Sequence, residues 1–509
     1  RQRQMCIRDR KIMSPESRLL DVDEVDGFIA QVWTGTSGTG NVYEGHYKSR
    51  TFETAYLEYG IMQELVKGTD KEVWFLQDPV EDNPEHGWEE YADKYKKTLT
   101  AALFWPDVDH YEVCPWPNRV FKGRYPRKVG LAEGMIPTED MEGAKNIPDT
   151  YATFLAGMIQ TLGDMTKEES ETEKDAVGVF LADSCMYQRT YPDQVEHHGQ
   201  KINLSGMEDW MNRLIFQKEE ERQLLLSMEK MEYAYKECCA FPDWFGLTLP
   251  LLKYGLPIQP VYFDHMVRYE EYLRKYRYLI LSYEFMKPES EEFHHKLVEW
   301  VKQGGTLFYI GKDFDPYNYL QEWWQKFSCD TPAQHLFAEF GMDKEPANGC
   351  YRIGEGNVLV WNEVPALLSV NEAIADKYRN WIREGLKMGG YHWNMCNYLS
   401  VRRDPYIVIA SMQESDTGSV YTKEGLFVDL YEDKYPVVER VLVEPGQEKL
   451  LFDLEKIKED VRIIATAARI ENMACENGQL SIDYAAGCAC LNGEELHLTP
   501  IEYKLLCLL

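Results

Sequence analysis

The sequence lacks several features that mark particular classes of protein. Its 12 cysteines include no Cys-x-x-Cys pair and no regular spacing, so neither a zinc site nor a disulfide framework is indicated. No apolar run approaches the roughly 18 residues that a membrane-spanning helix needs. Basic residues are few, because 55 Lys and Arg stand against 85 Asp and Glu, a formal net charge of −30. This balance argues against nucleic acid and anionic membranes as partners.

A phosphate-binding loop is also missing. The Gly-rich segment 34–45 contains Gly-x-x-Gly-x-Gly but no Lys-Ser/Thr pair. We therefore expect neither a cofactor nor a metal. Scattered cysteines fit a reducing compartment, and we expect a cytoplasmic protein. What the sequence does contain is 44% apolar residues in 509, which is enough for two to four domains with cores of their own.

Both ends of the chain differ from the rest. Residues 1–10 resemble the translation of a transposon sequencing adaptor, so we leave them out of the fold and expect the natural start to lie upstream. Residues 491–509, LNGEELHLTPIEYKLLCLL, resemble the beginning of the winged-helix domain of bacterial response regulators. They include no recognition helix and no basic wing, so no DNA binding is implied. The alternative is an ordinary end to the last β domain.

Residues 11–166 alternate apolar strands with loops and helices. In chain order, the predicted strands and helices are 25–33, 50–66, 71–79, 88–104, 108–113 and 149–165. Parallel strands that are each followed by a long loop and a helix are typical of a (β/α) barrel. Three or four such units cannot close a barrel of eight strands. We therefore predict the C-terminal half of a TIM barrel whose first half is missing.

Two further domains are expected after the charged linker at 166–175. Strands and helices alternate again over 176–345, which predicts a flavodoxin-like, doubly wound domain with a parallel sheet. Over 346–490, short β runs separated by turn signals, with one helix at 370–387, predict a β-sandwich domain. The fold class is thus α/β with an appended β domain.

One segment carries a resemblance to a known family. Residues 276–311, YRYLILSYEFMKPESEEFHHKLVEWVKQGGTLFYIG, closely resemble the trimerisation domain that follows the barrel in a group of bacterial β-galactosidases. That domain is related to glutamine amidotransferases but lacks their chemistry, and Cys185 stands after the wrong strand to supply their nucleophile. We expect the adjacent His294 and His295 on a solvated surface. The resemblance implies a glycoside hydrolase acting on carbohydrate, and a homo-oligomer for which a trimer is one form.

Glycoside hydrolysis needs two carboxylates that flank the scissile bond. The family that this chain resembles places the acid after the fourth barrel strand and the nucleophile after the seventh. Counting back from the last predicted helix makes 71–79 the seventh strand, so Asp78 stands where the family has Glu. Glu81 in the next loop could substitute, and Glu112 is the alternative if the count is wrong by one. The fourth strand is absent from the sequence, so the acid cannot be named.

The segment 110–121, HYEVCPWPNRVF, combines a carboxylate, an aromatic ring and a cation at a strand end. Its prolines predict a rigid loop, which would place Trp116 and Arg119 beside Glu112. Trp33, Tyr43 and Trp116 are candidate sugar platforms, and Arg119 is a candidate anchor. Ordinary packing at a barrel rim is the alternative for each of them.

Carboxylates at neighbouring strand ends are expected to repel each other, which would raise the pKa of one of them.

We predict a β-galactosidase-like hydrolase that is inactive as this chain, because half of the barrel and the acid are missing. The alternative is a non-catalytic carbohydrate-binding or assembly protein on the same scaffold.

Overall fold

The structure is a computed structural model that describes most of the chain between Pro15 and Leu496. The described ranges are 15–33, 40–43, 46–80, 86–108, 110–128, 139–165, 177–182, 196–197, 200–201, 242–313, 318, 323–369, 372–415, 420–459, 461–466, 470–476, 479–484, 489–491 and 494–496. The adaptor-like segment 1–10 and the linker at 166–175 therefore lie outside the described residues, as do residues 497–509 of the tail.

The first region is built on a three-stranded parallel sheet in the order β1, β4, β5. Its strands are β1 (Gly27–Trp33), β4 (Glu72–Asp78) and β5 (Tyr111–Glu112). Its helices are α2 (Thr51–Val66), α3 (Trp88–Leu103), α4 (Pro117–Phe121) and α5 (Asp149–Asp164). The predicted parallel arrangement is present, and among the described residues these three strands make an open sheet.

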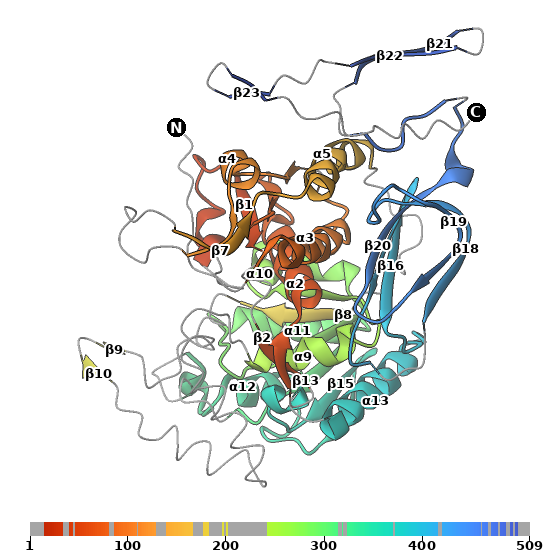
Figure 1. The fold of residues 1–509 in the computed structure, drawn as a ribbon. Coiled ribbons are helices and arrows are strands. Elements are labelled where there is room, and N and C mark those ends of the chain that lie inside the picture. The colour runs from red at the N-terminus through yellow and green to blue at the C-terminus, as the bar shows by residue number, and fades with distance from the viewer. Residues whose placement is uncertain are drawn as a thin grey trace.

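Helix α2 is buried on nearly every side, whereas the sequence predicts one apolar face with Gln63 as a polar exception. The reason is its position between two sheets: it packs against β1 and β4 and also against β11 (Ile258–Tyr262) of the next region (Figure 1). The Tyr56 hydroxyl donates to the Ile258 carbonyl at 3.1 Å. Gly60 admits the indole of Trp105, because a Cβ there would lie 2.3 Å from the ring.

The second region is a six-stranded sheet in the order β11, β8, β12, β13, β15, β14. Its other strands are β8 (Val177–Leu181), β12 (Tyr278–Leu281), β13 (Thr306–Ile310), β14 (Gly349–Ile353) and β15 (Gly356–Trp361). Its helices are α9 (Pro242–Leu252), α10 (His265–Arg268), α11 (Glu292–Lys302), α12 (Pro332–Glu339) and α13 (Glu372–Met388). All neighbours pair in parallel except β14 and β15. The first four strands follow the flavodoxin order 2-1-3-4.

The boundary predicted between 176–345 and 346–490 does not coincide with the edge of this sheet. Strand β15 pairs in parallel with β13, and β14 completes the edge in the antiparallel sense. Helix α13 packs on the same sheet, where Gly385 allows close contact with Phe308. The continuous apolar run of β15 is typical of a strand covered on both faces, which the sequence pattern alone did not separate from a sandwich strand.

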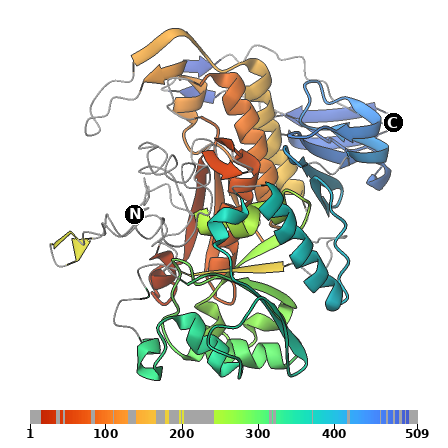
Figure 2. The same ribbon diagram turned by 90° about the horizontal axis from the view of Figure 1, so that it is seen from below.

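The third region is a five-stranded antiparallel sheet in the order β16, β17, β20, β18, β19. Its strands are β16 (Tyr398–Arg403), β17 (Tyr406–Ser411), β18 (Tyr421–Asp429), β19 (Val437–Val443) and β20 (Glu448–Asp453). One apolar face packs on α3 and α5 (Figure 2). A smaller apolar cluster joins β17, β18, β19 and β20. The two-sheet sandwich that we predicted is therefore, among the described residues, one sheet covered by helices.

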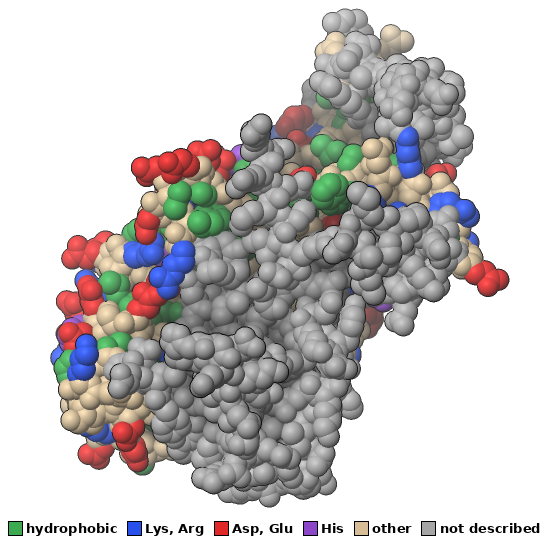
Figure 3. Space-filling view, turned by 90° about the vertical axis from the view of Figure 1, so that its left-hand side faces the viewer, with side chains coloured by type: hydrophobic (Ala, Val, Ile, Leu, Met, Phe, Trp, Pro, Cys, Tyr) green, Lys and Arg blue, Asp and Glu red, His purple; other side chains and the backbone are tan. Residues whose placement is uncertain are grey.

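Five separate β hairpins are also present among the described residues. They are β2 (Gly40–Tyr43) with β3 (His46–Ser49), β6 (Tyr125–Lys128) with β7 (Glu139–Lys145), β9 (Glu196–His197) with β10 (Gln200–Lys201), β21 (Ile470–Glu476) with β22 (Gln479–Tyr484), and β23 (Ala489–Leu491) with β24 (Glu494–Leu496). No helix in the described ranges is both long enough and apolar enough to cross a membrane. Among the coloured side chains visible in Figure 3, acidic and basic ones are interspersed.

Candidate functional site

The carboxyl edge of the first sheet brings two of the predicted carboxylates together. Trp33 is in register with Asp78 across β1 and β4, and Leu76 is in register with Glu112 across β4 and β5. Asp78 therefore lies two residues beyond the partner of Glu112. From strand spacing and rise, the α carbons of Asp78 and Glu112 are roughly 8 Å apart. The two residues share one edge without facing each other directly.

Asp78 is held inside the protein. Only 2% of the residue is exposed, and its Oδ1 accepts from the backbone N–H of Val80 at 3.4 Å. Its Oδ2 lies 3.8 Å from Nη1 of Arg119, which comes from α4. The sequence led us to place Arg119 beside Glu112 or a bound carboxylate, whereas the structure pairs it with Asp78. Arg119 also donates from Nε to the Tyr125 hydroxyl at 3.2 Å.

Glu112 is partly buried, and burial raises the pKa of its carboxyl group. The expected repulsion from Asp78 does not contribute to this shift, because the register keeps the two carboxylates apart. By extension of the register, the residue opposite Asp78 is Cys114. Burial first, and the charges of Asp78 and Glu112 after it, raise the pKa of the Cys114 thiol to about 12. The neutral thiol of Cys114 therefore lies within electrostatic range of both carboxylates.

The loop after β5 is anchored at both of its ends. The Tyr95 hydroxyl donates to the Val113 carbonyl at 3.0 Å, and Pro117 begins helix α4 directly after Trp116. Trp116 is partly exposed, so this aromatic ring remains available at the edge. Trp33 ends β1 at the same edge, but its side chain lies outside the described part of the structure, and Glu81 is also outside the described residues.

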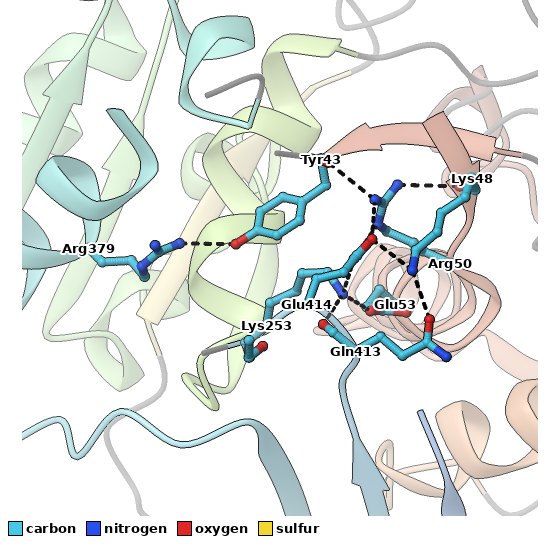
Figure 4. Close-up of polar contacts among 9 residues, drawn as sticks. Tyr43, Lys48, Arg50, Glu53, Lys253, Arg379, Gln413 and Glu414 are labelled. Atoms are coloured by element: carbon cyan, nitrogen blue, oxygen red, sulfur yellow. Dashed lines mark hydrogen bonds and ion pairs between the residues drawn. The ribbon is translucent and has the colours of Figure 1, made fainter. Parts of the chain in front are cut away.

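Tyr43 does not lie at this edge. It is fully buried, and its hydroxyl accepts from Nη1 of Arg379 at 3.0 Å (Figure 4). The cations of Arg50 and Lys253 lie 5.5 and 5.3 Å from the centre of its ring. This placement leaves no open aromatic face on which a sugar could stack.

The ion cluster around Tyr43 joins all three regions, and the sequence did not reveal it. Nζ of Lys253 lies 2.6 Å from Oε1 of Glu53 and 3.0 Å from Oε2 of Glu414 (Figure 4). Arg50 reaches the other Glu414 oxygen at 2.7 Å. Burial acts to raise the pKa of Glu414, but hydrogen bonds from Arg50 and the charge of Lys253 lower it to about 2. No local pattern links residues so distant in the chain.

The second region has a tight bend after β12. Phe285 occupies the strained left-handed conformation there, with a φ of 51°, and it is buried. The preceding Glu284 accepts from the backbone N–H groups of Lys312 and Asp313, both at 2.8 Å. This carboxylate thus ties the ends of β12 and β13 together.

His294 was expected on a solvated surface and is instead fully buried. Its Nε2 lies 2.8 Å from the Tyr283 hydroxyl, and its Nδ1 lies 2.8 Å from Nδ1 of His335. One face of α11 packs inward, and His294 falls on that face while His295 does not. Among the described residues, no group of three or more His, Cys, Asp or Glu side chains could hold a metal ion.

Comparison with known proteins gives structural neighbours only. No protein-family model matches the sequence, and no curated protein matches it. Among solved structures, β-galactosidase from Bacillus circulans sp. alkalophilus aligns with a TM-score of 0.40 and 11% identity, covering 79% of this chain and 58% of that one.

Two structures of the GH42 β-galactosidase Gan42B are also similar. A catalytic mutant from G. stearothermophilus aligns with a TM-score of 0.35 and 9% identity, covering 82% of this chain and 53% of that one. A further Gan42B structure aligns with a TM-score of 0.30 and 12% identity, covering 76% of this chain and 60% of that one. The chain thus spans little more than half the length of these proteins.

Proposed function

We propose that this chain carries a β-galactosidase-like carbohydrate site at the carboxyl edge of β1, β4 and β5, and that it binds sugar without hydrolysing it. The observation that carries the proposal is the register, which gathers the ends of three parallel strands at one edge with Asp78 and Glu112 among them. Active sites of parallel (β/α) folds form at this edge. Trp116 provides the aromatic face for a pyranose ring, and Arg119 holds Asp78 in place.

We further propose that this sheet is part of a TIM barrel. Its strands are parallel neighbours in chain order, and α2 and α3 cover one face. On the opposite face Ile29 is 53% exposed and Trp74 is 38% exposed. Parallel sheets are normally covered on both faces, so an open apolar face fits a sheet that belongs to a larger closed structure.

The carboxylates differ in ways that suit two roles. Burial raises the pKa of Glu112, so this group keeps its proton at higher pH and suits a general acid. Asp78, with Oδ2 3.8 Å from Nη1 of Arg119, takes the role of nucleophile or base in this proposal. Glu81 keeps its place as the alternative partner from the following loop. The burial of Asp78 leaves little room for direct contact with a sugar, which is why we expect binding without turnover.

The test is a titration of the chain with methyl β-galactoside, followed by tryptophan fluorescence and calorimetry. We expect saturable binding that Trp116→Ala abolishes. The matched control is Phe121→Ala, which removes an exposed ring from the helix that follows Trp116 and should leave binding unchanged. Equal loss in both variants, or no binding by the parent, would contradict the proposed site.

A parallel assay with an aryl β-galactoside separates binding from catalysis. We expect no turnover by this chain. If turnover is measurable, Asp78→Asn and Glu112→Gln should each reduce it by orders of magnitude without unfolding the protein. Turnover that survives both substitutions would place the chemistry elsewhere.

A further inference from the structure

The hairpin formed by β18 and β19 presents apolar side chains to solvent. Large exposed side chains on or beside it are Val420, Leu426, Val437 and Leu442, with exposed fractions of 41%, 37%, 43% and 50%. Strand β19 is the last strand of its sheet, and no other described strand pairs with its outer edge. An open apolar edge strand is a template for pairing with another strand.

The sequence of this edge is complementary to itself. Arg440, Leu442 and Glu444 alternate along the chain, so they point to one side of the strand, and all three are exposed. If a second copy pairs antiparallel about a two-fold axis through Leu442, the two Leu442 side chains meet. Each Arg440 then lies opposite Glu444 of the other copy. Opposite charges and apolar side chains directly across an antiparallel pair stabilise it.

Neighbouring registers are less favourable. A two-fold axis through Arg440 would place two guanidinium groups opposite each other, and an axis through Glu439 would do the same with two carboxylates. An axis through Val441 would place Arg440 opposite Leu442 and form no ion pair. The prolines Pro436 and Pro445 flank the strand and limit the ladder to a few residues.

We propose that the β19 edge is a self-association surface at which two copies of this chain form an antiparallel, two-fold contact centred on Leu442. The contact is short, so the dimer is weak and depends on protein concentration. This surface is independent of the carbohydrate site, since it belongs to a different sheet. A two-fold edge contact closes on itself, so it yields dimers and stops there.

The test is sedimentation velocity over a wide range of protein concentrations. The parent should show a reversible monomer–dimer equilibrium. Arg440→Glu alone and Glu444→Arg alone each place like charges across the contact and should raise the dissociation constant roughly tenfold. The double variant Arg440→Glu/Glu444→Arg restores opposite charges and should return the constant to the parental value. Thermal melting confirms that each variant is folded.

Leu442→Lys should abolish the dimer. Its control is Ile159→Lys, because Ile159 on α5 is 65% exposed and lies outside the hairpin. A parent that stays monomeric at every concentration would overturn the proposal. So would an oligomer that is indifferent to Leu442→Lys, or a double charge variant that associates no better than the single ones.

Discussion

Lys253 and Glu53 are 200 residues apart in the chain, yet their side chains form a 2.6 Å ion pair in which the lysine has no exposed surface. The pair connects α2 of the first region with the segment that follows α9 of the second. Glu414 from the β17–β18 connection approaches the same ammonium group. The three regions are therefore joined by buried charge as well as by apolar contact.

Removing the central cation should destabilise the protein strongly. Lys253→Met leaves the buried Glu53 without its ion-pair partner and removes one of the cations around the partly buried Glu414. Breaking a buried pair in this way costs roughly 3–5 kcal/mol. Urea unfolding followed by circular dichroism should show a lower midpoint. Lys377→Met, at an exposed position on α13, is the control and should change stability by less than about 0.5 kcal/mol. Equal effects would mean that the buried cluster contributes no more than a surface charge.

The same cluster should make the protein sensitive to acid. The pKa of Glu414 falls from its ordinary value of 4.5 to about 2 in the folded state. A carboxyl group with a lowered folded pKa contributes stability above its unfolded pKa, and that contribution is lost as the pH falls from 4.5 towards 2. Glu414→Gln should therefore flatten the pH dependence of the melting temperature in this window. If the slope of melting temperature against pH is unchanged, Glu414 does not contribute to the sensitivity to acid.

The buried Glu58 should lower the stability of the protein as the pH rises, whereas Glu414 lowers it as the pH falls. It is buried on α2 without a hydrogen bond at Oε2, and burial raises the pKa of its carboxyl group from 4.5 to about 8. Between these values the unfolded chain is ionised while the folded chain keeps its proton, so stability declines as the pH rises. At pH 7 the cost is roughly 3 kcal/mol. Glu58→Gln should raise the melting temperature near pH 8 and have little effect near pH 4.5; a shift of equal size at both would refute this.

His294 provides a third pH-dependent contribution. Burial first, and the neighbouring His335 and His295 after it, lower the pKa of His294 well below 6.5. A histidine whose folded pKa is lowered resists protonation, so stability falls as the pH drops below 6.5. His294→Phe should reduce this slope, whatever its effect on the melting temperature at neutral pH. The exposed His295→Phe should leave the slope as it is in the parent.

Much of the fold was predictable from local pattern. Apolar runs, helical periodicity and flanking prolines predict the strands β1, β4 and β5 and the helices between them. The parallel sheet of the second region follows in the same way, because strands alternate with helices. These features depend on residues close together in the chain, and the sequence records them directly. The region boundaries were less predictable, since the run 356–361 suits either a parallel strand or a sandwich strand, and only its pairing with β13 decides.

The candidate site likewise has features that the local sequence predicts and features that only tertiary contacts set. The sequence alone determined that Asp78 and Glu112 stand at strand ends and that a proline-containing loop follows Glu112. Only the tertiary structure decided that Arg119 pairs with Asp78, that Cys114 lies near both carboxylates, and that Tyr43 is buried among cations. Strand register and the packing of one region on another set these relations. Both arise from contacts between segments far apart in the chain, for which a single sequence carries no local signal.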